Sequence, residues 1–218
     1  MVAELKHHIP ERPDMAILEI GCSNGRWLRW FKQEYAARTF GVDTSLAGAS
    51  TVENFILADG LHLPLREDGF DVVFSMGLIE HFESSVSRYM LIEEHVRVAR
   101  RGEGIVWIEH PNMNFSLSYL WTKLYYDRRL GLKHYRTPCS ETEKHLRTMN
   151  VTILVARLLG WFPPKLMKLI PLTLQLSASA FYRRFPSVTG RLEMILNRKA
   201  FEHSLTAENF LIIGRRAD

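Results

Sequence analysis

Short apolar runs of strand length alternate with amphipathic stretches of helix length along the first half of the chain. Five runs are rich in apolar and β-branched residues, so we expect strands at residues 16–20, 39–43, 54–59, 70–75 and 104–110. Strands that alternate with helices in this way predict an α/β fold with a Rossmann-like, doubly wound, mostly parallel sheet.

Two of the stretches between these strands carry helix signals. The apolar face of residues 25–38 consists of Leu28, Phe31 and Tyr35. The second helix is expected from about Ser85 to Arg101, because serines precede it and Gly102 suits the residue that follows a helix. Its apolar face consists of Tyr89, Ile92, Val96 and Ala99.

The second half of the chain has weaker periodicity. Ser140 and Glu143 have capping-box spacing, and we expect a helix to begin there and extend as far as Gly160, although residues 150–152 weaken its middle. Residues 161–170 could form a sixth strand, and their two prolines would confine them to a sheet edge or to the start of a strand. Residues 208–216 are expected to form the last of seven strands.

Length and composition limit the class of protein. With 218 residues, 46% of them hydrophobic, the chain can form one domain with a full core. Its two cysteines, Cys22 and Cys139, have no disulfide or zinc-site spacing. The N-terminal residues lack a signal-peptide apolar segment, and residues 166–182, the most apolar stretch, contain Lys168, Pro171 and Gln175. We therefore expect a soluble, cytoplasmic protein.

The charge is unevenly distributed. Residues 1–110 carry 11 basic and 17 acidic side chains, a net of −6, whereas residues 111–218 carry 17 and 7, a net of +10. A basic half can bind lipid headgroups, nucleic acid or a phosphorylated substrate, or it can simply be a solvated surface. Peripheral membrane contact through this half is one expectation.

Polar residues stand at the ends of the predicted strands. They are Glu19, Asp43, Asp59, Ser75 and His110. Because ligands of doubly wound sheets bind beyond the carboxyl ends of the strands, this pattern predicts a ligand site there.

The turn after the first strand indicates which ligand. It has the sequence "ILEIGCSNG", which is neither the G-x-G-x-x-G of dinucleotide sites nor a Walker A loop, so a diphosphate ligand is disfavoured. Asp43 is placed to accept the two hydroxyls of a ribose, and Asp59 to accept the amine of adenine. Glu19 would suit a cationic amino-acid group.

Three stretches in order resemble the motifs of class I S-adenosylmethionine-dependent methyltransferases. They are "ILEIGCSNG", "FGVDTS" and "ADGLHLPLREDGFDVVFSMGLIEHF", within residues 10–113. The similarity is greatest to the subgroup that includes ubiquinone- and menaquinone-biosynthesis enzymes. The resemblance implies the cofactor S-adenosyl-L-methionine and the product S-adenosyl-L-homocysteine.

The resemblance also implies a set of cofactor-binding residues. The methionine and ribose side would be lined by Glu19, Gly21, Cys22, Ser23 and Gly25. Asp43 would hold the ribose, Thr44 would lie beside the adenine, and Asp59 and Gly60 would meet its amine and edge. Ser75 and Met76 would pass under the sulfonium, with His81 near the methyl path.

The chain departs from the family pattern in several ways. Ser23 replaces a glycine, which is tolerable if its φ is negative. Only 15 residues separate Asp43 from Asp59, so the helix usual there must be short or missing. Few residues precede the first strand, and residues 115–137 are our candidate cover for the cofactor.

Catalysis and metal binding are less strongly indicated. A histidine suits proton removal from a phenol or an acidic carbon, and His110 is the first candidate base and His81 the second. Glu80 and His81 resemble a metal-binding pair of some relatives, but those have another acid where this chain has Gly77. Because two ligands cannot make a site, no metal is expected.

The prediction is a single methyltransferase domain over residues 1–218. Residues 1–112 form the cofactor-binding half, 113–207 a helical and aromatic cover for the substrate, and 208–216 the terminal strand. The acceptor is expected to be a small, lipophilic or anionic molecule methylated at O, C or N. Two alternatives are a non-catalytic S-adenosylmethionine-binding partner subunit and a nucleic-acid methyltransferase, the latter ranked below the small-molecule enzyme. The acceptor's identity and the oligomeric state stay open.

Overall fold

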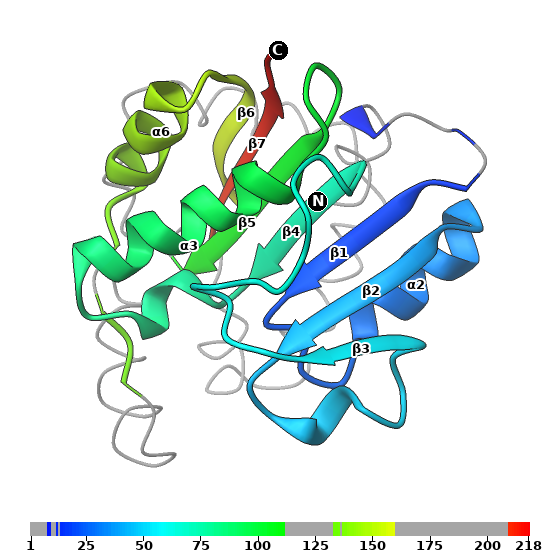
Figure 1. The fold of residues 1–218 in the computed structure, drawn as a ribbon. Helices are drawn as coiled ribbons and strands as arrows, with labels where there is room; N and C mark the ends of the chain where they lie inside the picture. Colours follow the sequence, from blue (N-terminus) through cyan, green and yellow to red (C-terminus); the bar gives the residue numbers. More distant parts are fainter. Residues whose placement is uncertain (1–7, 10–11, 13, 112–132, 136, 160–208) are drawn as a thin grey trace, which may run out of the picture.

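The computed structural model describes residues 8–9, 12, 14–111, 133–135, 137–159 and 209–218. Its seven strands are β1 (Ala16–Ile20), β2 (Arg38–Asp43), β3 (Asn54–Leu57), β4 (Val72–Met76), β5 (Ile105–Pro111), β6 (Val151–Leu159) and β7 (Asn209–Arg216). They form one sheet in the order β3-β2-β1-β4-β5-β7-β6 (Figure 1). The first five strands are parallel, and β7 is antiparallel to both β5 and β6. The predicted mostly parallel, seven-stranded sheet is therefore confirmed.

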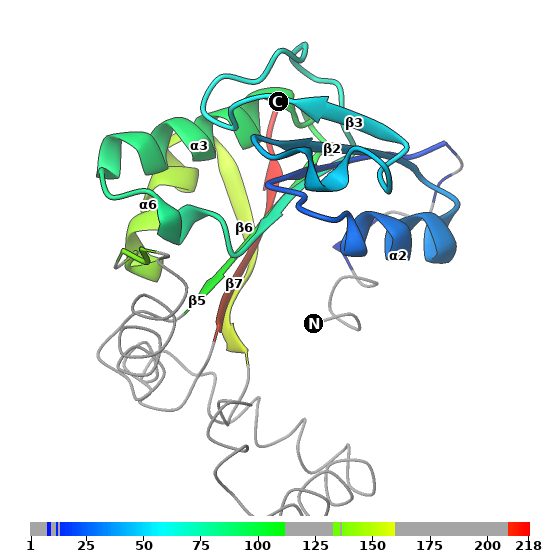
Figure 2. The same cartoon turned by 90° about the horizontal axis from the view of Figure 1, so that it is seen from below.

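Helices cover both faces of the sheet (Figures 1 and 2). On one face lies α2 (Arg26–Tyr35), and on the other lie α3 (Ser85–Val98) and α6 (Cys139–Thr148). Alternate residues of each strand point to opposite faces, so the sheet contributes to two cores. In β1, Ile17 packs with α2, whereas Leu18 and Ile20 pack with α3.

The predicted helix faces are the buried ones. Leu28 and Phe31 of α2 are buried, and the Phe31 ring lies 5.2 Å from the Phe74 ring of β4. Ser84 caps α3 by accepting a hydrogen bond from the backbone N–H of Val86 at 3.1 Å. Gly102 does not follow the helix directly, because α3 ends at Val98 and Gly102, at φ +76°, lies in the turn before β5.

The prediction for residues 140–160 was partly wrong. The helix α6 ends at Thr148, and Asn150 then adopts a left-handed φ of +57° that turns the chain into β6. The residue before α6 is Pro138, and no side chain caps its first turn, so Ser140 forms no capping box. The sixth strand is Val151–Leu159, in the interval expected to continue the helix, and residues 161–170 lie outside the described residues.

Residues 139–159 therefore contribute a helix and a strand to the sheet layers, although they fall within the interval 113–207 predicted to cover the substrate. The remainder of that interval, apart from residues 133–135 and 137–138, lies outside the described part of the chain. Between β2 and β3 the helix was expected to be short or missing, and the structure has only one 3₁₀ turn there, η1 (Leu46–Gly48). None of the described helices is both long and apolar enough to cross a membrane.

An arginine of β7 joins the last strand to the end of α3. The Arg216 Nη1 donates to the carbonyl oxygens of Val96 (2.8 Å), Arg97 (2.9 Å) and Ala99 (2.6 Å). It also forms an ion pair with Asp68, in the turn before β4, at 2.8 Å. A cation is favourable at a helix C-terminus, where carbonyl groups lack intrahelical partners.

We expect Arg216→Met to lower the free energy of unfolding by about 1–3 kcal/mol, because the partly buried carbonyls lose their donor. The neighbouring Arg215 is exposed, so Arg215→Met should change stability by less than about 0.5 kcal/mol. Urea denaturation of the two variants measures the difference. Equal effects would show that the contacts of Arg216 do not stabilise the fold.

Candidate functional site

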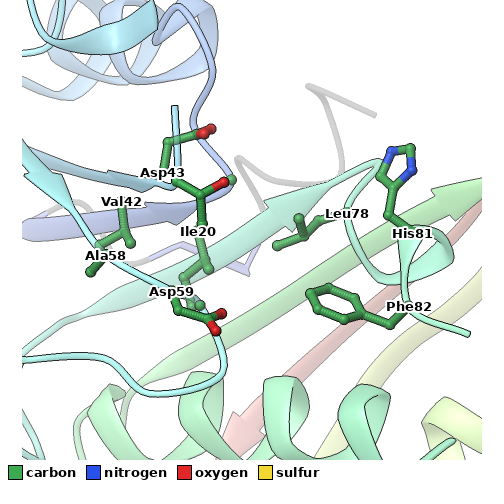
Figure 3. A pocket seen from close by; sticks show the side chains of 11 residues that line it. Ile20, Val42, Asp43, Ala58, Asp59, Leu78, His81 and Phe82 are labelled. Carbon is green, nitrogen blue, oxygen red and sulfur yellow. The ribbon is translucent and has the colours of Figure 1, made fainter. Parts of the chain in front are cut away.

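A cavity of about 370 Å³ lies beyond the carboxyl ends of β1, β2 and β3, beside the turn that follows β4 (Figure 3). The strand order reverses between β1 and β4, which is where doubly wound sheets bind their ligands. The walls of the cavity are formed by Ile20, Gly21, Val42, Asp43, Thr44, Ala58, Asp59, Gly60, Leu78, His81 and Phe82.

Two carboxylates at successive strand ends are the fixed acceptors of this cavity. The Asp43 oxygens accept from the backbone N–H groups of Ser23 and Ser45, each at 2.8 Å. Asp59 accepts from the backbone N–H of Leu61 at 2.9 Å. Each carboxylate oxygen can accept two hydrogen bonds, so both groups keep acceptor capacity for a ligand. Apolar Leu78 and Phe82 lie across from them (Figure 3).

The turn after β1 is tied to β2 through one carbonyl group. The oxygen of Val42 accepts from the backbone N–H groups of both Gly21 (2.8 Å) and Cys22 (3.0 Å). Gly21 and Gly25 adopt positive φ values of +76° and +67°. A Cβ at Gly25 would also come within 2.3 Å of the Val52 side chain, so glycine is required there.

Ser23 departs from expectation. A serine was expected to be tolerable at a negative φ, but its φ is +46°, in the left-handed region. The conformation directs its backbone N–H to Asp43 at 2.8 Å, and this bond helps to offset the strain. Ser23 is exposed and is not part of the cavity wall.

The loop that follows β3 is held in place by α3. Glu94 accepts from the backbone N–H of Leu63 at 2.6 Å. Arg97 donates to Glu94 at 2.6 Å and to the carbonyl oxygens of Leu63 (3.1 Å) and Leu65 (2.8 Å). This arrangement positions the segment that begins with Asp59, and neither Glu94 nor Arg97 was singled out from the sequence. The only signal was an acid and a base three residues apart on one helix.

The predicted cofactor-binding residues fall into two groups. Six of them line the cavity: Gly21, Asp43, Thr44, Asp59, Gly60 and His81. The others lie around it, as buried Glu19, Cys22, Gly25 and Ser75, half-buried Met76 and exposed Ser23. The apolar wall residues Ile20, Val42, Ala58, Leu78 and Phe82 were not predicted, although each lies within two residues of a predicted one.

Glu19 is a buried acid near the carboxyl end of β1, a strand in the interior of the sheet. Its side chain is 3% exposed, and its Oε2 has no hydrogen-bond partner among the described residues. Burial, reinforced by the negative charge of Asp43, raises the pKa of Glu19 to about 8. The group is therefore largely protonated at neutral pH until a cation approaches it.

The two candidate bases occupy different places. His110 is fully buried in β5, with Nδ1 3.1 Å from the Pro111 oxygen, and burial lowers its pKa to about 4. It does not line the cavity. His81 is exposed at the cavity wall, and its Nδ1 lies 3.2 Å from the Lys133 oxygen. Of the two, only His81 reaches the cavity, and a catalytic role stays a prediction for both.

The candidate cover, residues 115–137, is described only at its end. The backbone N–H of Tyr135 donates to the backbone carbonyl oxygen of Glu80 at 2.7 Å. This contact places the end of the interval against the 3₁₀ turn η2 (Ile79–His81) at the cavity wall. Apart from residues 133–135 and 137, the interval lies outside the described residues.

Comparison with known proteins bears on the chemistry of this site. Residues 18–108, which contain the whole cavity wall, match a family model described as "Methyltransferase domain". The match shows that the segment carrying the cavity is similar to methyltransferase domains. The finer placement in the ubiquinone- and menaquinone-biosynthesis subgroup stays a prediction.

The curated proteins that this chain resembles differ in acceptor. The bovine "Probable tRNA methyltransferase 9B" is 31% identical over 133 residues, which are 56% of this chain and 28% of the relative. Ajmaline N-methyltransferase of Rauvolfia serpentina is 29% identical over 50% of this chain and 40% of its own length. The chain thus spans less than half the length of either relative.

The fold is shared with solved methyltransferases. A SAM-dependent methyltransferase from Archaeoglobus fulgidus superposes with a TM-score of 0.66 at 16% identity, over 98% of this chain and 92% of that one. At this identity the likeness concerns the fold.

We expect the stability of the ligand-free protein to fall between pH 6.5 and 8. Glu19 remains protonated in the folded chain up to a pKa of about 8 but ionises near 4.5 when unfolded, so the folded state binds more protons in this window. Glu80, whose pKa burial also raises to about 8, acts in the same direction. Buried His95 and His110, with pKa values lowered from 6.5 to about 4, add stability as pH rises, but only below about 6.5.

In this pH window the free energy of unfolding should fall less steeply with pH in Glu19→Gln than in the wild type. The two slopes should differ by up to about 1.4 kcal/mol per pH unit. Urea denaturation of both proteins at several pH values gives the slopes. An unchanged slope would mean that Glu19 ionises normally in the folded chain.

Proposed function

We propose that the chain binds S-adenosylmethionine in this cavity and transfers its methyl group to a nucleophile of an acceptor molecule. The observation that carries the proposal is the pair of carboxylates, Asp43 and Asp59, at the ends of adjacent strands within the family-matched segment. Their positions suit a nucleoside, with ribose hydroxyls on Asp43 and the adenine amine on Asp59.

The remaining walls fit the other parts of the cofactor. Apolar Ile20, Val42 and Ala58 on one side, and Leu78 and Phe82 on the other, offer surfaces for a flat adenine ring. The Oε2 of Glu19, which has no hydrogen-bond partner in the described part of the chain, offers a buried acceptor for the ammonium group of a bound amino acid. Such a cation would return the Glu19 pKa toward its usual range and make it a carboxylate.

The cofactor, when bound, supplies a methyl group on a positively charged sulfur. The protein's part in such an in-line displacement is to align the nucleophile with the methyl carbon and to exclude water. His81, the histidine at the cavity wall, is placed to accept a proton from a nucleophile that arrives protonated.

We expect Asp43→Asn to weaken the binding of both S-adenosylmethionine and S-adenosylhomocysteine by about 10- to 100-fold. The reason is that hydrogen bonds to a charged acceptor contribute about 1.5–3 kcal/mol. Glu53→Gln is a matched control, since Glu53 is an exposed acid that pairs with Lys32 outside the cavity. Calorimetric titration of the two variants and the wild type measures the effect. Equal affinities in all three proteins would show that Asp43 does not contribute to binding. If none of the three bound either compound, the proposed cofactor would be refuted.

The acceptor is proposed to be a small molecule, lipophilic or anionic, with nucleic acid as a second candidate. The ajmaline enzyme is a relative with a small-molecule acceptor in its name, whereas the tRNA methyltransferase 9B proteins favour nucleic acid. The net charge of +10 over residues 111–218 is compatible with both. Nucleic acid is therefore kept as a second candidate acceptor.

Transfer of a labelled methyl group distinguishes these acceptors. Transfer to total tRNA that declines steeply as salt is raised would identify nucleic acid, because phosphate contacts release counterions. Transfer to small phenols, amines or lipid-linked acceptors with weak salt dependence would identify a small molecule. Turnover without any added subunit would exclude the non-catalytic partner. A cytoplasmic location with peripheral membrane contact stays a prediction.

A further inference from the structure

Three side chains that can ligate a metal meet beside the cavity. They are Glu80 and His81 of η2, and His134 from the described end of the candidate cover. One potential ligand atom of each lies within 4.8 Å of the corresponding atoms of the other two. His134 is 53 positions after His81, so this cluster is a product of folding rather than of a local motif.

The backbone holds the two sides of the cluster together. Tyr135, which follows His134, donates its N–H to the carbonyl oxygen of Glu80 at 2.7 Å. Before η2, Gly77 at φ +66° donates its N–H to the backbone carbonyl oxygen of Glu109 at 2.9 Å. This hydrogen bond anchors the turn on β5. The rings of His81 and His134 lie 4.8 Å apart between these two anchors.

Glu80 is the observation that points to a cation. Its side chain is only 2% exposed, and its Oε2 has no hydrogen-bond partner in the described part of the chain. Leaving a buried carboxyl oxygen without a partner is costly, and a bound cation removes that cost.

His81 has the contact expected of a metal-ligating histidine. Its Nδ1 lies 3.2 Å from the Lys133 oxygen, and in the tautomer that donates this hydrogen bond the lone pair is on Nε2. Ligating histidines almost always donate their other ring N–H to a carbonyl or carboxylate, which orients the ring. Lys133 thus provides the outer contact, and its neighbour His134 provides a ligand.

We propose that Glu80, His81 and His134 bind one divalent transition-metal ion. Two imidazoles with one carboxylate suit zinc, iron(II) or cobalt(II) rather than magnesium, which prefers oxygen ligands. Donor atoms about 2.1 Å from one ion lie about 3–4 Å from each other, so the cluster needs only a small contraction. The absence of a metal site was expected because Gly77 occupies the place of a second acid; His134 supplies the third ligand instead.

The ion would join residues 133–135 to the cavity wall. His81 belongs to both the cluster and the cavity, so metal binding restricts the position of its ring at the site. While the ion is bound, the Nε2 of His81 cannot accept a proton, so the proposed role of His81 as a base applies to the metal-free protein. Three protein ligands leave at least one coordination position for water or for an oxygen or nitrogen of another molecule. The site is distinct from the proposed cofactor contacts of Asp43 and Asp59.

The test is titration of chelator-treated, cofactor-free protein with cobalt(II), followed by the visible absorption of the bound ion and by metal stoichiometry after gel filtration. We expect one ion per chain. Glu80→Gln and His134→Asn should each weaken binding by at least about 10-fold, in line with the effect of losing even an outer-shell partner. His145→Asn is the control, because His145 is a partly buried histidine that stacks on Tyr89 away from the cluster.

Glu80→Gln keeps the shape of the side chain and introduces no charge, so it should fold, and circular dichroism melting in chelator checks this. Failure of the wild type to bind cobalt(II) or zinc at one equivalent would overturn the proposal. Undiminished binding by both cluster variants would also overturn it, because the ion would then be held elsewhere. Since no cofactor or acceptor is present, the result is independent of methyl transfer.

Discussion

The site depends on the carbonyl oxygen of Val42, which accepts two hydrogen bonds from the turn after β1. By binding the N–H groups of Gly21 and Cys22, it fixes where that turn lies relative to the end of β2. The next residue, Asp43, then receives the N–H of Ser23, and the turn and the carboxylate position each other. The carboxyl ends of parallel strands meet at one edge of a sheet, so Asp59 is delivered to the same cavity by β3.

Most of this arrangement was predictable because it is local. The strand ends, the glycine turn and the carboxylates Asp43 and Asp59 lie within short segments whose pattern specifies both conformation and direction. Alternation of strands and helices then determined the parallel sheet, because each crossover returns the chain in the same direction. The apolar walls are less visible in the sequence, since Leu78 or Ala58 could equally belong to a core.

Features that depend on distant contacts were missed. Residues 151–159 follow a helix and carry mixed signals, and they become a strand because β7, more than 50 positions later, pairs with them. Propensity is a weak indicator when such tertiary pairing is available. Ser23 at its positive φ donates its N–H to the Asp43 carboxylate, and His134 approaches Glu80 beside the hydrogen bond from the Tyr135 N–H to the Glu80 carbonyl. Both contacts join residues that are at least 20 positions apart, so the local sequence does not indicate them. The motifs of the first half predict a cofactor, whereas no motif of the second half predicts an acceptor.

The position of β7 has a consequence for how the chain folds. It lies between β5 and β6, yet it follows both in the sequence. Strands β1 to β5 can assemble by successive crossovers, but until β7 is made, β5 is an open edge and β6 has no neighbour in the sheet. On the ribosome the nascent chain would therefore hold an unfinished sheet, and chaperones that bind exposed strands would meet it at that stage.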